Sequence, residues 1–120
     1  MNDDFVPFEL SVKLKEKGFP QDDFIGYDGF ETLCIGDENS IVCASPTISQ
    51  VLKWLREEKK IYVSILPFAT YSTIDRVAFY YLIEYNSTGE TMLSIEQDNY
   101  CVEWNDSALD GISYVLNNLI

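Results

Sequence analysis

Clustered carboxylates are the residues of this sequence best suited to do chemistry. Two carboxylates held close together can share acid and base roles in catalysis, or bind Mg²⁺ through their oxygens. Each cluster, however, stands in a polar stretch typical of a solvated turn. We therefore predict no catalytic residue, no metal site and no cofactor. The clusters are Asp22-Asp23, Asp37-Glu38 and Glu96-Gln97-Asp98.

Other common catalytic residues are missing or unsuitably spaced. The 120 residues contain no histidine, which removes the commonest general base and the commonest zinc ligand. The six glycines are scattered and form no phosphate-binding loop. The three cysteines, Cys34, Cys43 and Cys101, lack metal-site spacing, so we expect free thiols. The sequence thus favours a protein that is not an enzyme, and leaves an enzyme as the alternative.

Aromatic side chains are the remaining resource for function. They make up 14% of the chain, and several tyrosines gather between residues 62 and 85. Such residues pack in cores and on sheet faces, but tyrosine and tryptophan are also enriched at protein interfaces. The predicted binding residues are Trp54, Tyr114, Tyr71 and Tyr62.

The charge of the chain narrows the choice of partner. The formal net charge is −12, with eight Lys and Arg against twenty Asp and Glu. Binding to nucleic acid needs cations that displace counterions from phosphate, and anionic membranes need the same. We therefore predict no nucleic-acid and no membrane partner. The acidity keeps the protein in solution, meets a basic protein surface, or mimics a nucleic acid; these three interpretations stay open.

One stretch, residues 45–66, organises the elements that must position these side chains. Pro46 suits a first helical position, and Thr47 with Gln50 fits a capping box. The spacing of Ile48, Val51, Leu52 and Leu55 then predicts one buried helical stripe. From residue 61 the apolar period becomes two, which indicates a strand.

Trp54 lies roughly 110° from the centre of that stripe, at 100° per residue. The spacing places it at the border of the buried face, where it either closes the core or anchors a partner. We favour the core, because Tyr114 in the last helix points more clearly outward from its own buried stripe.

The whole chain predicts an α+β fold in the order α-βββ-α-βββ-α, with three helices and a mainly antiparallel sheet of five to six strands. Residues 61–66, 76–85 and 91–95 form an antiparallel meander, whose middle strand 76–85 is apolar on both faces and so covered on both. Asp28-Gly29 predicts a two-residue hairpin turn. Residues 1–120 form one domain, with 1–6 disordered. The other elements are helices at 7–17 and 105–118 and strands at 24–27, 30–35 and 41–43.

The same sequence bears on location. It has no apolar run of 18 residues, and its acidic start lacks the build of a secretion signal. We expect a cytoplasmic protein, either a monomer or a homodimer.

Three segments also carry a resemblance: residues 9–19, 44–57 and 111–120, which include Lys17-Gly18-Phe19, Ser45-Pro46-Thr47 and Gly111-Ile112-Ser113. They resemble a family of small uncharacterised proteins from phages and mobile elements of gut Bacteroides-type bacteria. The resemblance implies an accessory protein of the cytosol and carries over no activity, cofactor or functional residue.

We therefore predict a non-enzymatic interaction module of a phage or mobile element that binds a protein partner, with a basic surface of that partner as the candidate contact. The alternative is a small-ligand binder or enzyme that uses carboxylates and tyrosines in a pocket beside the sheet. An interaction module should show an exposed aromatic patch, whereas an enzyme should show a cleft with at least two convergent carboxylates.

Overall fold

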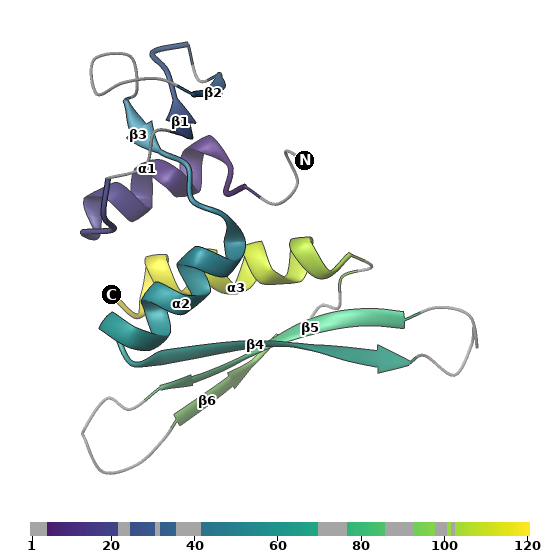
Figure 1. Ribbon diagram of the computed structural model, residues 1–120. Helices are drawn as coiled ribbons and strands as arrows, with labels where there is room; N and C mark the ends of the chain where they lie inside the picture. Colours follow the sequence, from purple (N-terminus) through teal and green to yellow (C-terminus); the bar gives the residue numbers. More distant parts are fainter. Residues whose placement is uncertain are drawn as a thin grey trace.

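The computed structural model describes residues 5–21, 25–30, 32–35, 42–69, 77–85, 93–97, 101 and 103–120. In this part of the chain the fold is α+β, as predicted, and holds three helices (Figure 1). The elements in chain order are α1 (Phe8–Glu16), β1 (Ile25–Tyr27), β2 (Leu33–Ile35), β3 (Cys43–Ala44), α2 (Ile48–Glu58), β4 (Ile61–Ala69), β5 (Val77–Tyr85), β6 (Leu93–Glu96) and α3 (Trp104–Asn118).

The larger sheet is the antiparallel meander that the sequence predicts. Its spatial order is β4-β5-β6, with β5 in the middle. β4 and β5 pair along their full length, from Ile61 opposite Tyr85 to Ala69 opposite Val77. β6 pairs with the end of β5, where Leu93 lies opposite Tyr85.

The prediction of one sheet of five to six strands is wrong. β1, β2 and β3 form a separate antiparallel sheet in the order β2-β1-β3, with strands of two or three residues. The physical reason is α2, which follows β3 after three residues and leads the chain away from the small sheet (Figure 1). β4 therefore starts beneath the helices and does not pair with a strand of the small sheet.

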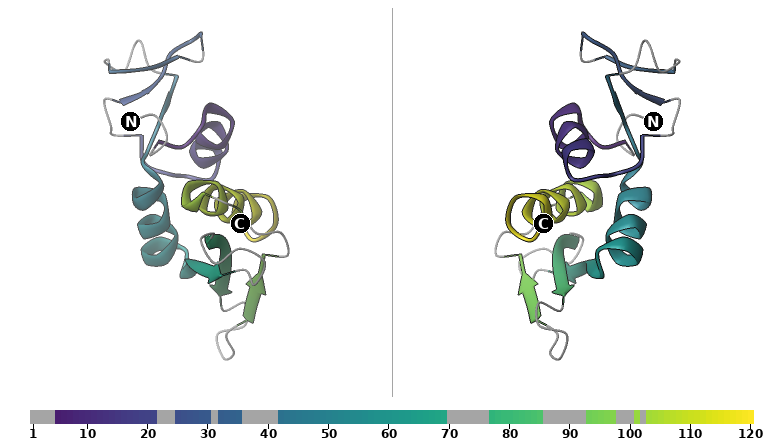
Figure 2. Two further views of the ribbon diagram at one scale, coloured as in Figure 1. Left: turned by 90° about the vertical axis from the view of Figure 1, so that its right-hand side faces the viewer. Right: turned by 90° about the vertical axis from the view of Figure 1, so that its left-hand side faces the viewer.

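Four layers follow from this arrangement. α2 and α3 lie on one face of the larger sheet, α1 packs on the opposite side of α3, and the small sheet lies beyond α1 (Figures 1 and 2). The buried cluster between these layers draws side chains from all three helices and from β4 and β5. Its members are Val6, Leu14, Phe19, Ile48, Val51, Leu55, Ile61, Tyr81, Ile83, Ala108, Ile112, Val115 and Leu116.

The start of α2 has the predicted capping box. The Gln50 backbone N–H donates to the Thr47 hydroxyl at 3.2 Å, and the Thr47 N–H donates to Gln50 Oε1 at 2.8 Å. Two donors of the first helical turn are thereby satisfied. At the other end Lys60 takes a positive φ of 57°, which turns the chain directly into β4.

α3 lies very close to the sheet at a glycine. A Cβ added at Gly111 would come within 3.1 Å of Val63 Cγ1 and 3.2 Å of Tyr81 Cβ. The absence of a side chain there lets the helix backbone approach β4 and β5. The helix begins at Trp104, before the predicted start at residue 105, with Glu103 as its N-cap.

The chain preceding α1 is partly ordered, although we expected residues 1–6 to be disordered. Phe5 bridges Thr47, and Val6 is fully buried. The Val6 carbonyl accepts hydrogen bonds from Ser11 Oγ, Tyr27 Oη and Ser45 Oγ at 2.9–3.1 Å. Residues 1–4 lie outside the described part.

The predicted two-residue turn at Asp28-Gly29 is also wrong. β1 and β2 pair at Tyr27 and Leu33, so the connection runs over residues 28–32. Asp28 Oδ1 accepts from the backbone N–H groups of Phe30 at 2.8 Å and Thr32 at 3.0 Å. This side-chain cap stabilises a longer loop.

Among the described residues, no helix is long and apolar enough to cross a membrane.

Candidate functional surface

The larger sheet has one covered face and one open face. β5 is central, as predicted, but it is covered on one side instead of both. Ile83 and Tyr81, which face α2 and α3, are 0% and 9% exposed. The helices are all on that side, and no described element lies on the other (Figure 1). The reason is topological, because α2 and α3 both pack on the same face and α1 packs on α3.

We call the open side the outer sheet face. Side chains alternate between the two sides of a strand, and directly paired residues share a side. The pairing therefore assigns to this face the residues Tyr62, Ser64 and Leu66 of β4, Ala78, Tyr80, Leu82 and Glu84 of β5, and Ser94 and Glu96 of β6.

This surface is partly aromatic and aliphatic. Tyr62 is 41% exposed, and Leu66, Tyr80 and Leu82 are partly exposed. β4 and β5 are nine residues long and β6 is four residues long, so the three strands together cover roughly 350 Å² at the usual rise and spacing. Apolar patches of a few hundred Å² on a monomer are often functional.

The charge on the outer sheet face has one sign. Glu84 lies opposite Tyr62 and Ser94, and Glu96 lies opposite Leu82. Among the described residues of this face there is no Lys or Arg. The aromatic and aliphatic residues thus have one carboxylate beside them on the central strand, Glu84, and one on β6, Glu96.

The four predicted binding residues do not come together. Tyr62 lies on the outer sheet face. Trp54 is on α2 and Tyr114 on α3, both on the covered side of the sheet. Tyr71 lies outside the described residues.

Trp54 sits at the border of the buried face of α2, as the helical spacing predicts. Its ring is partly buried and packs edge-on against Phe19, with centroids 5.2 Å apart and an interplanar angle of 69°. Lys59 Nζ lies 5.3 Å from the ring centroid. The exposed side of the ring lines a shallow hollow of about 240 Å³ between α2 and Pro20. These contacts favour a role at the edge of the core.

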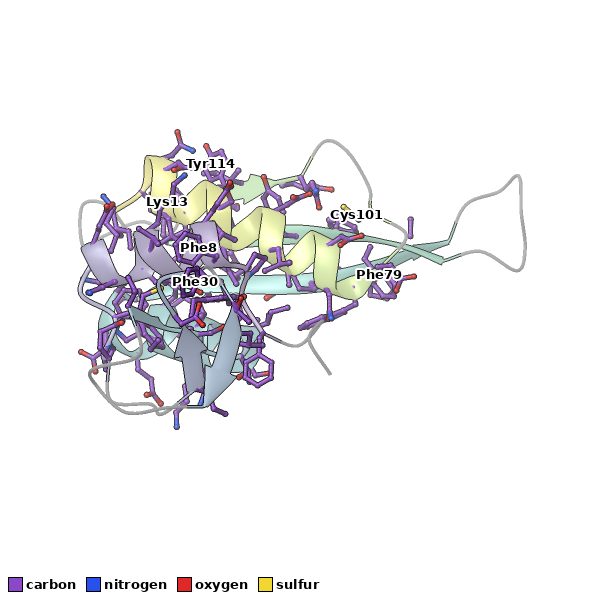
Figure 3. All side chains as sticks on the ribbon, turned by 90° about the horizontal axis from the view of Figure 1, so that it is seen from above. Phe8, Lys13, Phe30, Phe79, Cys101 and Tyr114 are labelled. Carbon is purple, nitrogen blue, oxygen red and sulfur yellow. The ribbon has the colours of Figure 1, made fainter. Side chains whose placement is uncertain are left out.

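Tyr114 does not point away from the core, contrary to the sequence prediction. It is partly buried and lies 6.3 Å from the ring of Tyr81, centroid to centroid, at 39°. The reason is that α3 occupies the middle layer, with α1 on one side and the sheet on the other, so little of its circumference is free. Tyr114 lies toward the C-terminal half of α3 (Figure 3).

The carboxylate clusters give no convergent pair in the described part of the chain. Glu96 is exposed, whereas Gln97 is 7% exposed and turns inward. Asp22, Asp23, Asp37, Glu38 and Asp98 lie outside the described residues. In the described ranges, no group of three or more Cys, Asp or Glu residues is arranged to hold a metal ion.

The two described thiols are free and poorly reactive. Burial raises the pKa of Cys43 above its ordinary value of 9.0, although the charge of Lys15 lowers it slightly. Burial also raises the pKa of Cys101, as does its hydrogen bond to Asp110. A thiol that stays protonated at neutral pH is a weak nucleophile.

A polar hollow beside α3 was missed at the sequence level. Its lining includes Gln97, Asp110 and Ser113. A signal was present in the spacing of Asp106, Asp110, Ser113 and Asn117, which places polar residues along one side of a helix.

No protein-family model, curated protein or solved structure matches this chain. Its function must therefore be inferred from its own surfaces.

Proposed function

We propose that the protein is a non-enzymatic interaction module that binds a protein partner through the outer sheet face. The observation that carries this proposal is an open sheet face that presents Tyr62, Leu66, Tyr80 and Leu82 to solvent beside two carboxylates. A sheet usually buries its apolar face against another layer, and here the described chain supplies that layer on one side alone.

The charges of this face indicate the chemistry of the partner. Glu84 and Glu96 would attract Lys or Arg side chains that flank an apolar stripe. A second copy of this chain is disfavoured as the occupant, because it would place the same carboxylates together on molecules that each carry a net charge of −12. The partner is therefore an amphipathic element, such as a helix, with an apolar stripe and basic flanks.

The setting is part of the same proposal. The resemblance of residues 9–19, 44–57 and 111–120 to small phage and mobile-element proteins supports an accessory protein of the cytoplasm that binds a host or phage protein. The protein is then a monomer before it meets its partner.

The alternative function, a small-ligand binder or enzyme, has one observation in its favour, the polar hollow beside α3. Asp110 is the one carboxylate among the described residues that line it. Acid–base catalysis by a carboxylate pair needs a second carboxylate close to Asp110, so the hollow supports ligand binding better than catalysis.

The test is a pull-down with matched variants from cells that carry the parent element. Leu82→Lys places a positive charge in the middle of the outer sheet face, where it would repel a basic partner. Leu93→Lys is its control, because Leu93 is 42% exposed and belongs to the same sheet but lies on the other side of the strand. A second pair compares Glu84→Lys with Glu16→Lys, an exposed position on α1.

The expected result is one partner, identified by mass spectrometry, that the wild type and both controls retain and that Leu82→Lys and Glu84→Lys lose. Circular dichroism confirms that each variant is folded. A partner retained equally by all five proteins would show that another surface binds it.

A further inference from the structure

The polar hollow beside α3 is built around an oriented carboxylate. It has a volume of about 420 Å³, within the range of small-ligand sites. It adjoins a second hollow of about 470 Å³ toward α1, which shares Asp110 and Ser113 with it. The lining of the first hollow is Tyr81, Gln97, Asp110, Ser113, Tyr114, Asn117 and Asn118.

Asp110 is held in place from behind. Gln97 Nε2 donates to Asp110 Oδ2 at 3.1 Å, and the Cys101 thiol donates to the same oxygen at 3.4 Å. Gln97 is itself 7% exposed, and its Oε1 accepts from the Tyr81 backbone N–H and the Ser107 hydroxyl. Asp110 itself is exposed, and one of its oxygens is held by a hydrogen-bond network whose inner members, Gln97 and Ser107, are buried.

Asp110 has no charged partner among the residues that the structure describes. Lys13 of α1, which lines the adjoining hollow, instead donates to Asn117 Oδ1 at 2.8 Å. Asp106, one turn before Asp110, adds negative charge on the same side of α3. Burial is the main reason why the pKa of Cys101 is raised, and the charges of Asp110 and Asp106 add to it.

Aromatic rings complete the site. Tyr114 and Tyr81 lie against each other at the wall of the hollow, with centroids 6.3 Å apart. The face of a tyrosine ring attracts cations, most often the planar guanidinium of arginine. Hydroxyl and amide groups of Ser113 and Asn118 supply further polar contacts.

We infer that this hollow binds a guanidinium group, paired with Asp110 and stacked on Tyr114. A guanidinium presents five N–H donors in a planar fork, which matches a fixed carboxylate beside an aromatic face and several oxygen acceptors. An ammonium is a compact, strongly hydrated charge that makes less use of the ring. The group can come from an arginine side chain of a protein or from a small free guanidinium compound.

The probes are N-acetyl-arginine amide, the corresponding lysine compound and the corresponding citrulline compound, a neutral isostere of arginine. Binding is followed by chemical-shift changes in ¹H–¹⁵N spectra at low salt. The arginine compound should shift the amides of β6, Gln97 and α3 from Asp110 to Asn118. The lysine compound should bind several-fold more weakly, and the citrulline compound at least tenfold more weakly.

A second titration, with an arginine-containing tripeptide, distinguishes an arginine side chain of a protein from a small free guanidinium compound. A dissociation constant at least fivefold lower for the tripeptide than for the amide indicates a protein ligand. Equal or weaker binding of the tripeptide indicates a small free compound. Either result supports a guanidinium site.

Asp110→Asn should weaken arginine binding at least tenfold, because it removes the charge and keeps an acceptor for Gln97. Glu57→Gln is the control, with an effect of twofold or less, because Glu57 is an exposed carboxylate on α2 that does not line the hollow. If Asp110→Asn does not fold, Ser113→Lys serves instead, because it places a competing ammonium one turn from Asp110 and should abolish binding.

Three results would overturn the inference: equal binding of arginine and citrulline, arginine binding that Asp110→Asn leaves unchanged, or shifts confined to another surface. Leu82→Lys should leave arginine binding unchanged, because Leu82 lies on the outer sheet face. The guanidinium site and the partner-binding surface can therefore be refuted independently of each other.

Discussion

Trp54→Ala should destabilise the protein, because Trp54 closes the edge of the core between α2 and the segment after α1. Its ring contacts Phe19, which is 8% exposed, and lies beneath Lys59 Nζ. The alanine variant loses the buried part of the indole, the edge-on ring contact and the cation–π contact together.

The size of the loss follows from these contacts. Truncation of a fully buried aromatic side chain costs about 3–5 kcal/mol. Trp54 is partly buried, so about half of this is expected, or roughly 2 kcal/mol. The ring pair adds about 0.5–1.5 kcal/mol, and an exposed cation–π contact about 0.5 kcal/mol. These terms overlap, and a total of about 2–3 kcal/mol is expected, a large share of the stability of a domain this size.

Urea unfolding followed by circular dichroism measures this loss without interference from Trp104. With a slope of about 1–3 kcal/mol per molar urea, the midpoint should fall by roughly 1–2 M. Trp54→Phe keeps an aromatic edge contact and should lose about half as much, and Lys59→Gln should lose less than about 1 kcal/mol. A midpoint equal to that of the wild type would refute the core-edge role and make Trp54 a candidate for partner binding.

Three further predictions concern packing, thiol chemistry and charge. Gly111→Leu should cost about 2–3 kcal/mol by overpacking, because its Cβ alone would lie 3.1 Å from Val63, whereas Gly29→Ala, in open space, should change the unfolding midpoint little. Cys43 and Cys101 bind their protons more tightly in the folded state than in the unfolded state, so their contribution to stability is complete below pH 9.0 and is lost as the pH rises further. Alkylation at pH 8 should accordingly be slower in the folded protein than in urea. In a gel-shift experiment at physiological salt, micromolar protein should leave duplex DNA unshifted, and a salt-sensitive complex would contradict this prediction.

Much of the local structure could be predicted because it depends on residues that are close together in the sequence. The capping box of Thr47 and Gln50 lies within one turn, and the change of period at residue 61 marks the step from α2 to β4. Gly18, with a φ of 94°, follows the C-cap of α1, directly after the helix predicted over residues 7–17. The central position of β5 followed from its apolar residues and its short connection to β6.

Apart from the local turn at Asp28, the errors have a different origin, because they depend on contacts between distant residues. The apolar residues on both sides of β5 predict burial of both faces, but burial depends on where the helices pack, and local periodicity contains no information about that packing (Figure 1). The spacing within α3 alone predicts an outward Tyr114, whereas in the fold Tyr81 of the sheet lies next to its ring. The hydrogen bonds to Asp110 come from Gln97 and Cys101, which both lie outside α3. The spacing of residues within α3 therefore predicts the polar side of the helix but not these partners.

The central claim is that the outer sheet face binds the partner, and radical footprinting of side chains tests it most directly. The chain supplies internal controls, because Tyr62 is 41% exposed on that face while Trp104 is 37% and Phe30 89% exposed elsewhere. Addition of the partner identified by pull-down should reduce the labelling of Tyr62 several-fold and leave Trp104 and Phe30 unchanged. Labelling of Tyr62 that is unchanged at saturating partner would contradict the claim.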